Sequence, residues 1–328
     1  MMRPDDGAAA NHFVAPNEAV IGIDVGGTKA HAVLYSAAGA IASSRRATDV
    51  TGLPGLLATL RAVVDDVVRA PEAGQYGIRR QRDISRIGIG IPGIVSSQAG
   101  TVSHAVNVGL PEADVPLAHL ASAEFGVPVT LTHDVTAATL GSARLMGVDD
   151  DVALISLGTG LAVGLILDGT PRHGLLGSAG EIGHIPYVAD GPECPCGQRG
   201  CLELYASGQA LNRLWGGDPS GASKPAEHLL ACAARGDEDA LAARSIWIGA
   251  VAHAVTTVGL TLDVATILMG GGVAGAGEPL VEVLRAELRR RAQGSAFLNR
   301  MDLADRVELV PPELDVAPLG AALIAIDS

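Results

Sequence analysis

The sequence predicts an α/β protein of two domains with a duplicated core. An apolar run, a glycine-containing turn and a second apolar run follow one another at residues 19–36 and again at residues 151–169. Two such hairpins in the two halves of a chain indicate a duplicated α/β domain, with one glycine turn in each copy. The length of 328 residues agrees with two domains, because a single ordinary core rarely serves so long a chain.

The composition limits the classes of function. Hydrophobic residues make up 48 % of the chain and aromatic residues only 3 %, so aliphatic residues and alanine must fill the core. The net charge of −13 argues against a nucleic-acid-binding surface, which needs clustered lysine and arginine. An acidic protein can still bind an anionic nucleotide through backbone amides and a metal ion.

Residues 1–18 are rich in alanine, proline and acidic residues and show no apolar periodicity. We expect a disordered tail there, and the segment lacks the basic and apolar regions of a signal peptide. The apolar runs of the predicted strands are too short to cross a bilayer. The sequence therefore predicts a soluble cytoplasmic protein.

The first hairpin joins the strands AVIGI and HAVLYS through the segment DVGGTK. Gly26 and Gly27 permit a positive φ, and their amides can approach a phosphate closely because no side chain covers them. Thr28 adds a hydroxyl and Lys29 a cation. An ordinary glycine hairpin has the same pattern, but the Asp24 carboxylate beside the turn can hold hydrated Mg²⁺.

Helical and extended segments follow in alternation. Residues 54–70 have apolar positions at helical spacing, residues 86–91 read as a central strand, and residues 116–125 as a helix. Asn107 lies in a polar, loop-like segment before that helix.

The strand VPVTLT delivers His133 and Asp134 to the start of the helical segment VTAATLGSARLMG. An aspartate at such a junction is most often an N-cap. From the residues alone, an N-cap and a functional carboxylate both stay open for Asp134.

The second hairpin has a turn formed by Gly158, Thr159 and Gly160. We expect helices within residues 206–235, over residues 238–260 and from about Glu278. The apolar strand ATILM runs into Gly270, Gly271, Gly272 and Val273, and the final segment VAPLGAALIAI is expected to form a helix that packs back onto the first domain.

Metal-ligand residue types cluster after the second hairpin, namely His184, Cys194, Cys196 and Cys201. Three thiolates and one imidazole complete a tetrahedral zinc shell, and four protein ligands indicate a structural zinc rather than a hydrolytic one. The alternatives are a disulfide with a leftover thiol, or buried small hydrophobic residues. Cys232 lies apart in a helical segment and is expected to be an inert core thiol.

Glu181 and Glu203 bracket this cluster. A zinc loop that fixes two carboxylates and an imidazole indicates a scaffold for a polar ligand.

Together these motifs resemble the ROK family of sugar kinases and repressors, in the actin-like ATPase superfamily. The resemblance extends from Ile21 to Ile326, and its most specific part is E-x-G-H followed by C-x-C-G-x-x-G-C-x-E. It implies a duplicated, ribonuclease H-like α/β fold with an interdomain cleft. We expect a small domain of residues 19–134 plus 314–328, and a large domain of residues 135–313 with the zinc site and the adenosine motif.

The resemblance also implies functions for the motif residues. Asp24–Lys29 is similar to the first phosphate motif, Gly158–Gly160 to the second and Gly270–Val273 to the adenosine motif, so ATP with Mg²⁺ near Asp24 is the implied donor. Asp134 takes the position of the catalytic base, which accepts a proton from the attacking sugar hydroxyl. The implied sugar-binding residues are Asn107, His133, Asp134, Glu181, His184 and Glu203.

The chain departs from the family pattern next to the base. Glucokinase-like members usually have Asn-Asp-x-Asn, whereas this chain has His133 before Asp134 and Thr136 two residues after it. The tryptophan often found shortly after Asn107 is absent too. Phosphorylation of glucose at its 6-hydroxyl is the first expectation, with N-acetylglucosamine, N-acetylmannosamine or another hexose as alternatives.

Other functions agree less well with the sequence. The family's repressors carry a helix-turn-helix module before the kinase-like fold, and residues 1–18 are too few for one. A sugar sensor without activity is supported only by His133, a zinc hydrolase would need an open coordination position, and a polyphosphate donor would need a basic groove. We expect a homodimeric sugar kinase without a nucleic-acid or membrane partner.

Overall fold

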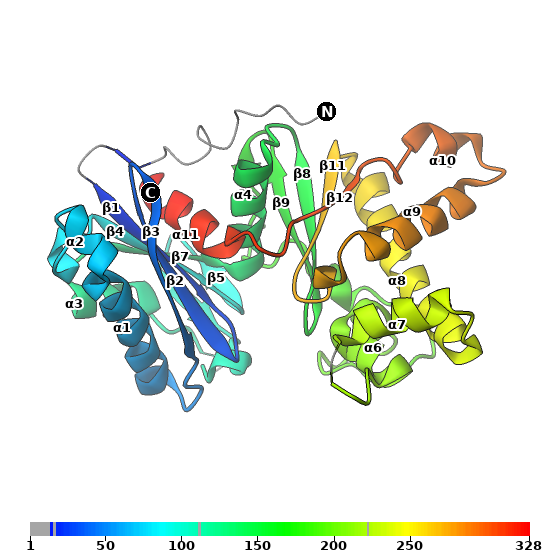
Figure 1. Ribbon diagram of the computed structural model, residues 1–328, viewed down its shortest axis with the longest axis horizontal. Helices are drawn as coiled ribbons and strands as arrows, with labels where there is room; N and C mark the ends of the chain where they lie inside the picture. The colour runs from blue at the N-terminus through cyan, green and yellow to red at the C-terminus, as the bar shows by residue number, and fades with distance from the viewer. Residues whose placement is uncertain (1–13, 16–17, 111–112, 222) are drawn as a thin grey trace. The chain divides into compact units, whose positions relative to one another are not determined.

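The computed structural model describes residues 14–15, 18–110, 113–221 and 223–328 (Figure 1). Most of the predicted disordered tail, residues 1–18, lies outside the described residues. The chain divides into two compact units, which are described separately. Unit 1 comprises the described residues up to Asp149, together with Pro171–Ala179 and Asp315–Ser328, and unit 2 comprises Asp150–Thr170 and Gly180–Leu314.

Unit 1 contains a five-stranded sheet of order β3-β2-β1-β4-β7. Its strands are β1 (Ala19–Val25), β2 (Lys29–Ser36), β3 (Gly39–Ala47), β4 (Arg86–Ile91) and β7 (Val129–His133). The predicted first hairpin is confirmed, because β1 and β2 pair in antiparallel fashion, while β1, β4 and β7 run parallel. A small antiparallel pair, β5 (Ile94–Ser96) and β6 (Thr101–Ser103), follows β4.

The helices of unit 1 are α1 (Leu53–Arg69), α2 (Pro71–Gln75), α3 (Leu117–Phe125), α4 (Asp134–Met146) and α11 (Val316–Ile326), with short 3₁₀ turns η2 (Gln81–Asp83) and η3 (Val106–Val108). Side chains of β1 alternate between the two sheet faces. Ile21 and Ile23 share a core with α1, and Val20 shares one with α11. The helices predicted at residues 54–70 and 116–125 are confirmed within one residue at each end.

Glycines bring α11 very close to its neighbours. A Cβ added at Gly22 would lie 1.7 Å from the Pro318 carbonyl oxygen, and one at Gly88 would lie 1.8 Å from that of Ala321. The same holds between α4 and α11, where a Cβ on Gly141 would meet the Val316 oxygen at 1.8 Å. A larger residue at Gly22 or Gly88 would push α11 away from the sheet, and one at Gly141 would push it away from α4.

The packing of α4 on α11 and β4 explains a difference from the predicted domain boundary. We expected the small domain to end at residue 134, but the division falls after Asp149, so α4 belongs to unit 1. Residue 314 lies in unit 2, and the short segment Pro171–Ala179 returns to unit 1.

Unit 2 repeats the arrangement of unit 1 with a sheet of order β10-β9-β8-β11-β12. Its strands are β8 (Val152–Leu157), β9 (Leu161–Leu167), β10 (Thr170–Pro171), β11 (Thr266–Gly270) and β12 (Val307–Leu309). Here β8 and β9 are antiparallel, whereas β8, β11 and β12 run parallel, as β1, β4 and β7 do in unit 1. The predicted duplication of the core is therefore confirmed.

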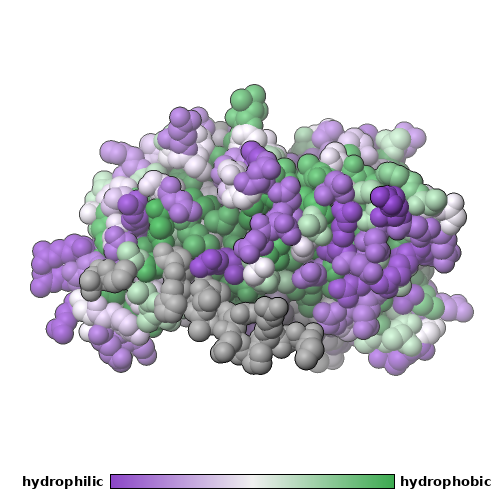
Figure 2. All heavy atoms as spheres, turned by 90° about the horizontal axis from the view of Figure 1, so that it is seen from above, coloured by the Kyte–Doolittle hydropathy of each residue, from purple (hydrophilic) through white to green (hydrophobic). Residues whose placement is uncertain are grey.

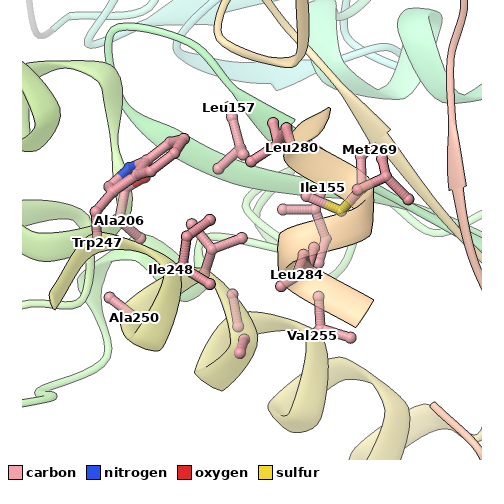
Figure 3. Packing of buried hydrophobic residues seen from close by; sticks show 14 of the residues in the cluster. Ile155, Leu157, Ala206, Trp247, Ile248, Ala250, Val255, Met269, Leu280 and Leu284 are labelled. Atoms are coloured by element: carbon pink, nitrogen blue, oxygen red, sulfur yellow. The ribbon is translucent and has the colours of Figure 1, made fainter. Parts of the chain in front are cut away.

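The helices of unit 2 are α5 (Glu203–Ala206), α6 (Gly208–Trp215), α7 (Pro225–Ala234), α8 (Glu238–Leu262), α9 (Glu278–Ala292) and α10 (Ala296–Met301), with 3₁₀ turns η4 (Ile182–His184) and η5 (Ala274–Ala276). The helical material expected at 206–235 is interrupted, because Gly216 ends α6 in the left-handed conformation with φ 73°. Figure 3 shows the core of unit 2, in which fully buried Trp247 donates a hydrogen bond from its indole Nε1 to the Ala206 oxygen at 2.9 Å.

One helix in the described part of the chain, α8, is long and apolar enough to cross a membrane by length and composition. This is weak support for a span, since half of its apolar window is buried inside the protein and buried core helices pass the same test. Ile248 of α8 belongs to the same core cluster as Ile155 of β8 and Leu284 of α9 (Figure 3). Hydrophilic side chains cover much of the face seen in Figure 2.

Candidate functional site

The first glycine turn lies between β1 and β2 and is closed by hydrogen bonds to the backbone of Gly26. The Gly26 amide donates to the Lys29 oxygen at 2.9 Å, and the Thr48 hydroxyl donates to the Gly26 oxygen at 2.7 Å. A Cβ on Gly27 would lie 2.7 Å from the Asn107 carbonyl oxygen. The turn and Asn107 therefore lie together in unit 1, although 80 residues of sequence separate them.

The parallel strands of unit 1 bring two carboxylates to the same edge of the sheet. Asp24 is opposite Gly90 in the register of β1 and β4, and Ile91 is opposite His133 in that of β4 and β7. Asp134 directly follows β7. Burial, followed by the charge of the Asp134 carboxylate, raises the pKa of Asp24 to about 7, and Lys29 opposes this shift.

Asp134 is the first residue of α4, and its carboxylate is held locally. Its Oδ1 accepts a hydrogen bond from the Val135 amide at 2.8 Å and lies 3.2 Å from Nδ1 of His133. His133 occupies the N-cap position with extended backbone and forms no capping hydrogen bond through its side chain. The N-cap interpretation of Asp134 is therefore wrong. Its carboxylate is half-buried, as is Asp24, whose pKa it helps to raise.

His173 is a neighbour of this group that the sequence did not predict. It lies in the segment Pro171–Ala179, which interrupts unit 2 in sequence but belongs to unit 1. Gly177 fixes the segment against β5, since a Cβ there would lie 2.3 Å from the Val95 oxygen. Burial, with a smaller contribution from His133, lowers the pKa of the His173 imidazole. No local motif marks this return of the chain, so only the tertiary fold reveals it.

In unit 2, the second glycine turn joins β8 and β9. The Gly158 amide donates to the Gly160 oxygen at 3.1 Å, and the Gly158 oxygen accepts from the Gly208 amide at the start of α6 at 2.9 Å. The Glu203 carboxylate accepts a hydrogen bond from the Leu161 amide at 2.9 Å. A Cβ on Gly160 would lie 2.3 Å from the same Glu203 oxygen, so a larger residue there would displace the end of the Glu203 side chain.

The third glycine motif, Gly270–Val273, lies beside the second turn. Gly270 is opposite Ser156 in the register of β11 and β8, and the Val273 amide donates to the Leu157 oxygen at 2.9 Å. Gly271 has φ 85°, where a side chain is strained. Glycine amides at the carboxyl ends of two parallel strands form a surface that a nucleotide can approach closely.

The four predicted metal-ligand residues converge in unit 2. Nitrogen or sulfur atoms of His184, Cys194, Cys196 and Cys201 all lie within 4.8 Å of one another. The Cys196 and Cys201 sulfurs are 3.6 Å apart, and Nδ1 of His184 lies 3.8 Å from the Cys194 sulfur. A donor set of three sulfurs and one imidazole nitrogen fits zinc.

The two ring nitrogens of His184 have different neighbours. Nδ1 lies beside a sulfur, while Nε2 lies 3.9 Å from a carboxylate oxygen of Glu181. Glu203 follows Cys201 by two residues and begins α5. The sulfur cluster therefore lies beside an imidazole whose second nitrogen is near the Glu181 carboxylate, and Glu203 follows its last cysteine closely.

These features define a duplicated α/β protein with a glycine turn in each unit. The profile of the ROK family matches residues 20–327, and the chain therefore belongs to the ROK family. A glucokinase from Streptomyces coelicolor is 32 % identical over 291 residues, which cover 82 % of this chain and 87 % of that protein. A xylose repressor from Caldicellulosiruptor bescii is 34 % identical over 199 residues, covering 58 % of this chain and 47 % of that protein.

Among solved structures, the chain is similar to a ROK family glucokinase from Streptomyces griseus in complex with glucose and AMPPNP. The TM-score is 0.75 at 27 % identity, with 94 % of this chain and 100 % of that chain covered. The predicted duplicated actin-like ATPase fold is thus confirmed.

Proposed function

We propose that this protein is an ATP-dependent hexose kinase in which Asp134 is the general base. The observation that carries the proposal is the position of Asp134 in unit 1, at the sheet edge that also holds Asp24 and the first glycine turn. Phosphoryl transfer needs a carboxylate near the attacking hydroxyl and charge-neutralising groups near the phosphates.

In unit 1 we assign the phosphates of ATP to the first turn. The amides of Gly27 and Thr28 would donate to phosphate oxygens, and the Lys29 ammonium would neutralise charge. Asp24 is the carboxylate that would hold Mg²⁺ through its water ligands, and the ion would neutralise negative charge on the phosphates of bound ATP. Binding of a cation there would favour ionised Asp24 against the effect of its burial.

The Asp134 carboxylate has one oxygen occupied by the Val135 amide and His133. Its other oxygen is left to accept the proton of the sugar hydroxyl. His133 and Asn107 in unit 1 are assigned to hydroxyl groups of the sugar, since each hydroxyl that leaves water needs a new donor or acceptor.

In unit 2 we assign Glu181, His184 and Glu203 to the sugar as well. The contact of Nδ1 with the sulfur cluster supports zinc binding at that nitrogen, so that Nε2 faces the substrate. Gly158–Gly160 and Gly270–Val273 are assigned to the nucleotide.

The zinc would be structural, with His184, Cys194, Cys196 and Cys201 as its ligands. Zinc would supply a rigid cross-link for a loop that has little apolar core of its own. With four protein ligands it would have no open position for water, which disfavours a hydrolase.

Glucose is the first candidate substrate, and N-acetylglucosamine and N-acetylmannosamine are alternatives because His133 stands where an asparagine is expected. A non-catalytic sugar-binding regulator is the rival function, favoured by the similarity to a xylose repressor. The presence of Asp24, Asp134 and both glycine turns supports the kinase. We further propose a cytoplasmic homodimer.

The test is a coupled ADP-release assay with Mg²⁺-ATP and a panel of hexoses and N-acetylhexosamines. One substrate with turnover of at least 1 per second, on the scale typical of kinases, supports the proposal. Sugar binding by calorimetry without ADP release for any member of the panel would favour the regulator. Polyphosphate replaces ATP in a parallel series. Turnover with polyphosphate but none with ATP would contradict the assignment of ATP.

A further inference from the structure

The chain uses lysine sparingly. It has 23 lysine and arginine residues in total, and only Lys29 and Lys224 are lysines. Lys29 belongs to the first glycine turn of unit 1. Lys224 directly precedes α7 in unit 2, and none of the motifs described above includes it.

The structure places the Lys224 ammonium beside Gly275, two residues beyond the third glycine motif. A Cβ on Gly275 would lie 2.9 Å from the Lys224 ammonium nitrogen. Gly275 is the middle residue of η5, which begins directly after Val273. The Lys224 side chain therefore reaches from the residue before α7 to η5, which directly follows the loop that we assign to the nucleotide.

The backbone of Lys224 is well fixed. In the preceding loop, both carboxylate oxygens of Asp218 accept hydrogen bonds from Ser220 and Ser223, at 2.7–3.0 Å. Pro225 follows at the first position of α7, and the Lys224 amide donates to the Glu227 carboxylate at 3.3 Å. An anchored backbone lowers the entropy lost when the side chain binds a ligand.

The Lys224 ammonium supplies a positive charge that the glycine loops of unit 2 lack. Neither glycine loop of unit 2, at residues 157–161 or 270–276, contains a lysine or an arginine. Among the ion pairs formed by described residues, none engages the Lys224 ammonium. An exposed cation that rests on a glycine loop suits an anionic group bound by that loop.

We propose that Lys224 is a nucleotide-positioning residue whose ammonium pairs with the α-phosphate of ATP. The inference rests on the proposed function, because it takes the Gly270–Val273 loop as the adenosine end of the nucleotide site. Lysine acts there as a compact point charge, and Gly275 leaves room for it.

The first experiment compares Lys224→Met with wild-type protein by calorimetry, using adenosine, AMP and ADP with Mg²⁺. AMP and ADP should bind about tenfold more weakly, as expected for the loss of one charge-assisted contact, and adenosine should bind equally well. Lys224→Arg should restore most of the affinity. Arg300→Met, which removes an exposed cation from α10, is the matched control and should bind all three ligands as wild type does.

A second variant tests the geometry. Gly275→Ala should displace the ammonium and weaken AMP binding in the wild-type background. In the Lys224→Met background, the same substitution should weaken AMP binding little further. With an active enzyme, Lys224→Met should raise KM for ATP about tenfold and leave KM for the sugar unchanged.

Equal binding of AMP by Lys224→Met and wild type would overturn the inference, and so would an equal loss for adenosine. The inference would also be overturned if Lys224→Met and Gly275→Ala had fully additive effects on the free energy of AMP binding. If the wild-type protein binds none of the three nucleotides, the proposed kinase function itself fails, which is a separate outcome.

Discussion

Nδ1 of His133 lies 3.2 Å from Oδ1 of Asp134, and both residues stand where β7 passes into α4. The same oxygen accepts a hydrogen bond from the Val135 amide at 2.8 Å. This relationship fixes the orientation of the carboxylate through one of its two oxygens. His133 therefore orients Asp134 independently of any ligand.

Asp134→Asn should lower turnover by about 10²–10⁴-fold, because a general base contributes about that much and the amide cannot take the proton. Sugar affinity, measured by calorimetry, should stay within about threefold of wild type, since the amide oxygen can still accept hydrogen bonds. Asp149→Asn, an exposed residue of unit 1, is the control for loss of charge. Turnover near the wild-type rate in Asp134→Asn would remove the base from the mechanism.

Asp24 should make stability depend on pH. Its pKa is about 7 in the folded protein, against an ordinary value of 3.8. Between about pH 4 and pH 7 the folded state therefore holds a proton that the unfolded state has released, so the free energy of unfolding contributed by this group falls as the pH rises through that window. Asp24→Asn should remove the effect, and the variant should be more stable than wild type at pH 8 but of similar stability at pH 4.

Urea unfolding of both proteins at pH 4, 6 and 8, without nucleotide or added metal, checks this prediction. If the free energies of unfolding of the two proteins change with pH in parallel, Asp24 has an ordinary pKa in the folded protein.

Cys196→Ser should release the bound metal and destabilise unit 2. Replacing one thiolate of a four-ligand zinc shell weakens the cross-link, so we expect less than half an equivalent of zinc and a Tm lower by several degrees. Metal analysis by mass spectrometry and thermal unfolding measure the two effects. Cys232→Ser is the matched control, because Cys232 lies outside the cluster, and it should keep its zinc. Wild-type protein purified without chelators and found free of zinc would contradict the assignment.

Gly88→Ala should destabilise unit 1 by about 1–3 kcal/mol, as expected for overpacking. The added methyl group would lie 1.8 Å from the Ala321 oxygen, so α11 must shift away from β4. Gly74→Ala, on the short helix α2, meets no atom within 4 Å and should be neutral or slightly stabilising. Urea unfolding measures the free energy of unfolding of both variants. Equal values would mean that α11 can shift away from β4 without loss of stability.

Local patterns explain why much of the fold was predictable. The apolar runs of β1, β8 and β11 are short and buried, and each ends at a glycine turn or loop. The final helix was predicted at its observed bounds because residues 316–326 are almost wholly apolar. The metal cluster was predictable because its ligands lie within 18 residues of sequence, from His184 to Cys201.

One difference from the predictions concerns α4, whose sequence is helical but whose partners are distant. The predicted domain boundary placed this helix in the large domain, whereas it belongs to unit 1. Gly141 of α4 contacts the Val316 carbonyl and thereby ties the helix to α11. Helical periodicity shows which face of a helix is buried but does not show what covers it.

The sequence by itself determined the duplicated pattern of strands, the three glycine motifs, the order of the metal ligands and the family to which they point. These are local features, set by side-chain period and by the spacing of residue types over a few turns of chain. Only the tertiary structure decided that His173 returns to unit 1, that Glu203 binds the Leu161 amide and that Lys224 lies on Gly275. Each of these contacts joins residues far apart in the chain, and they depend on how sheets and helices pack, which no short stretch of sequence encodes.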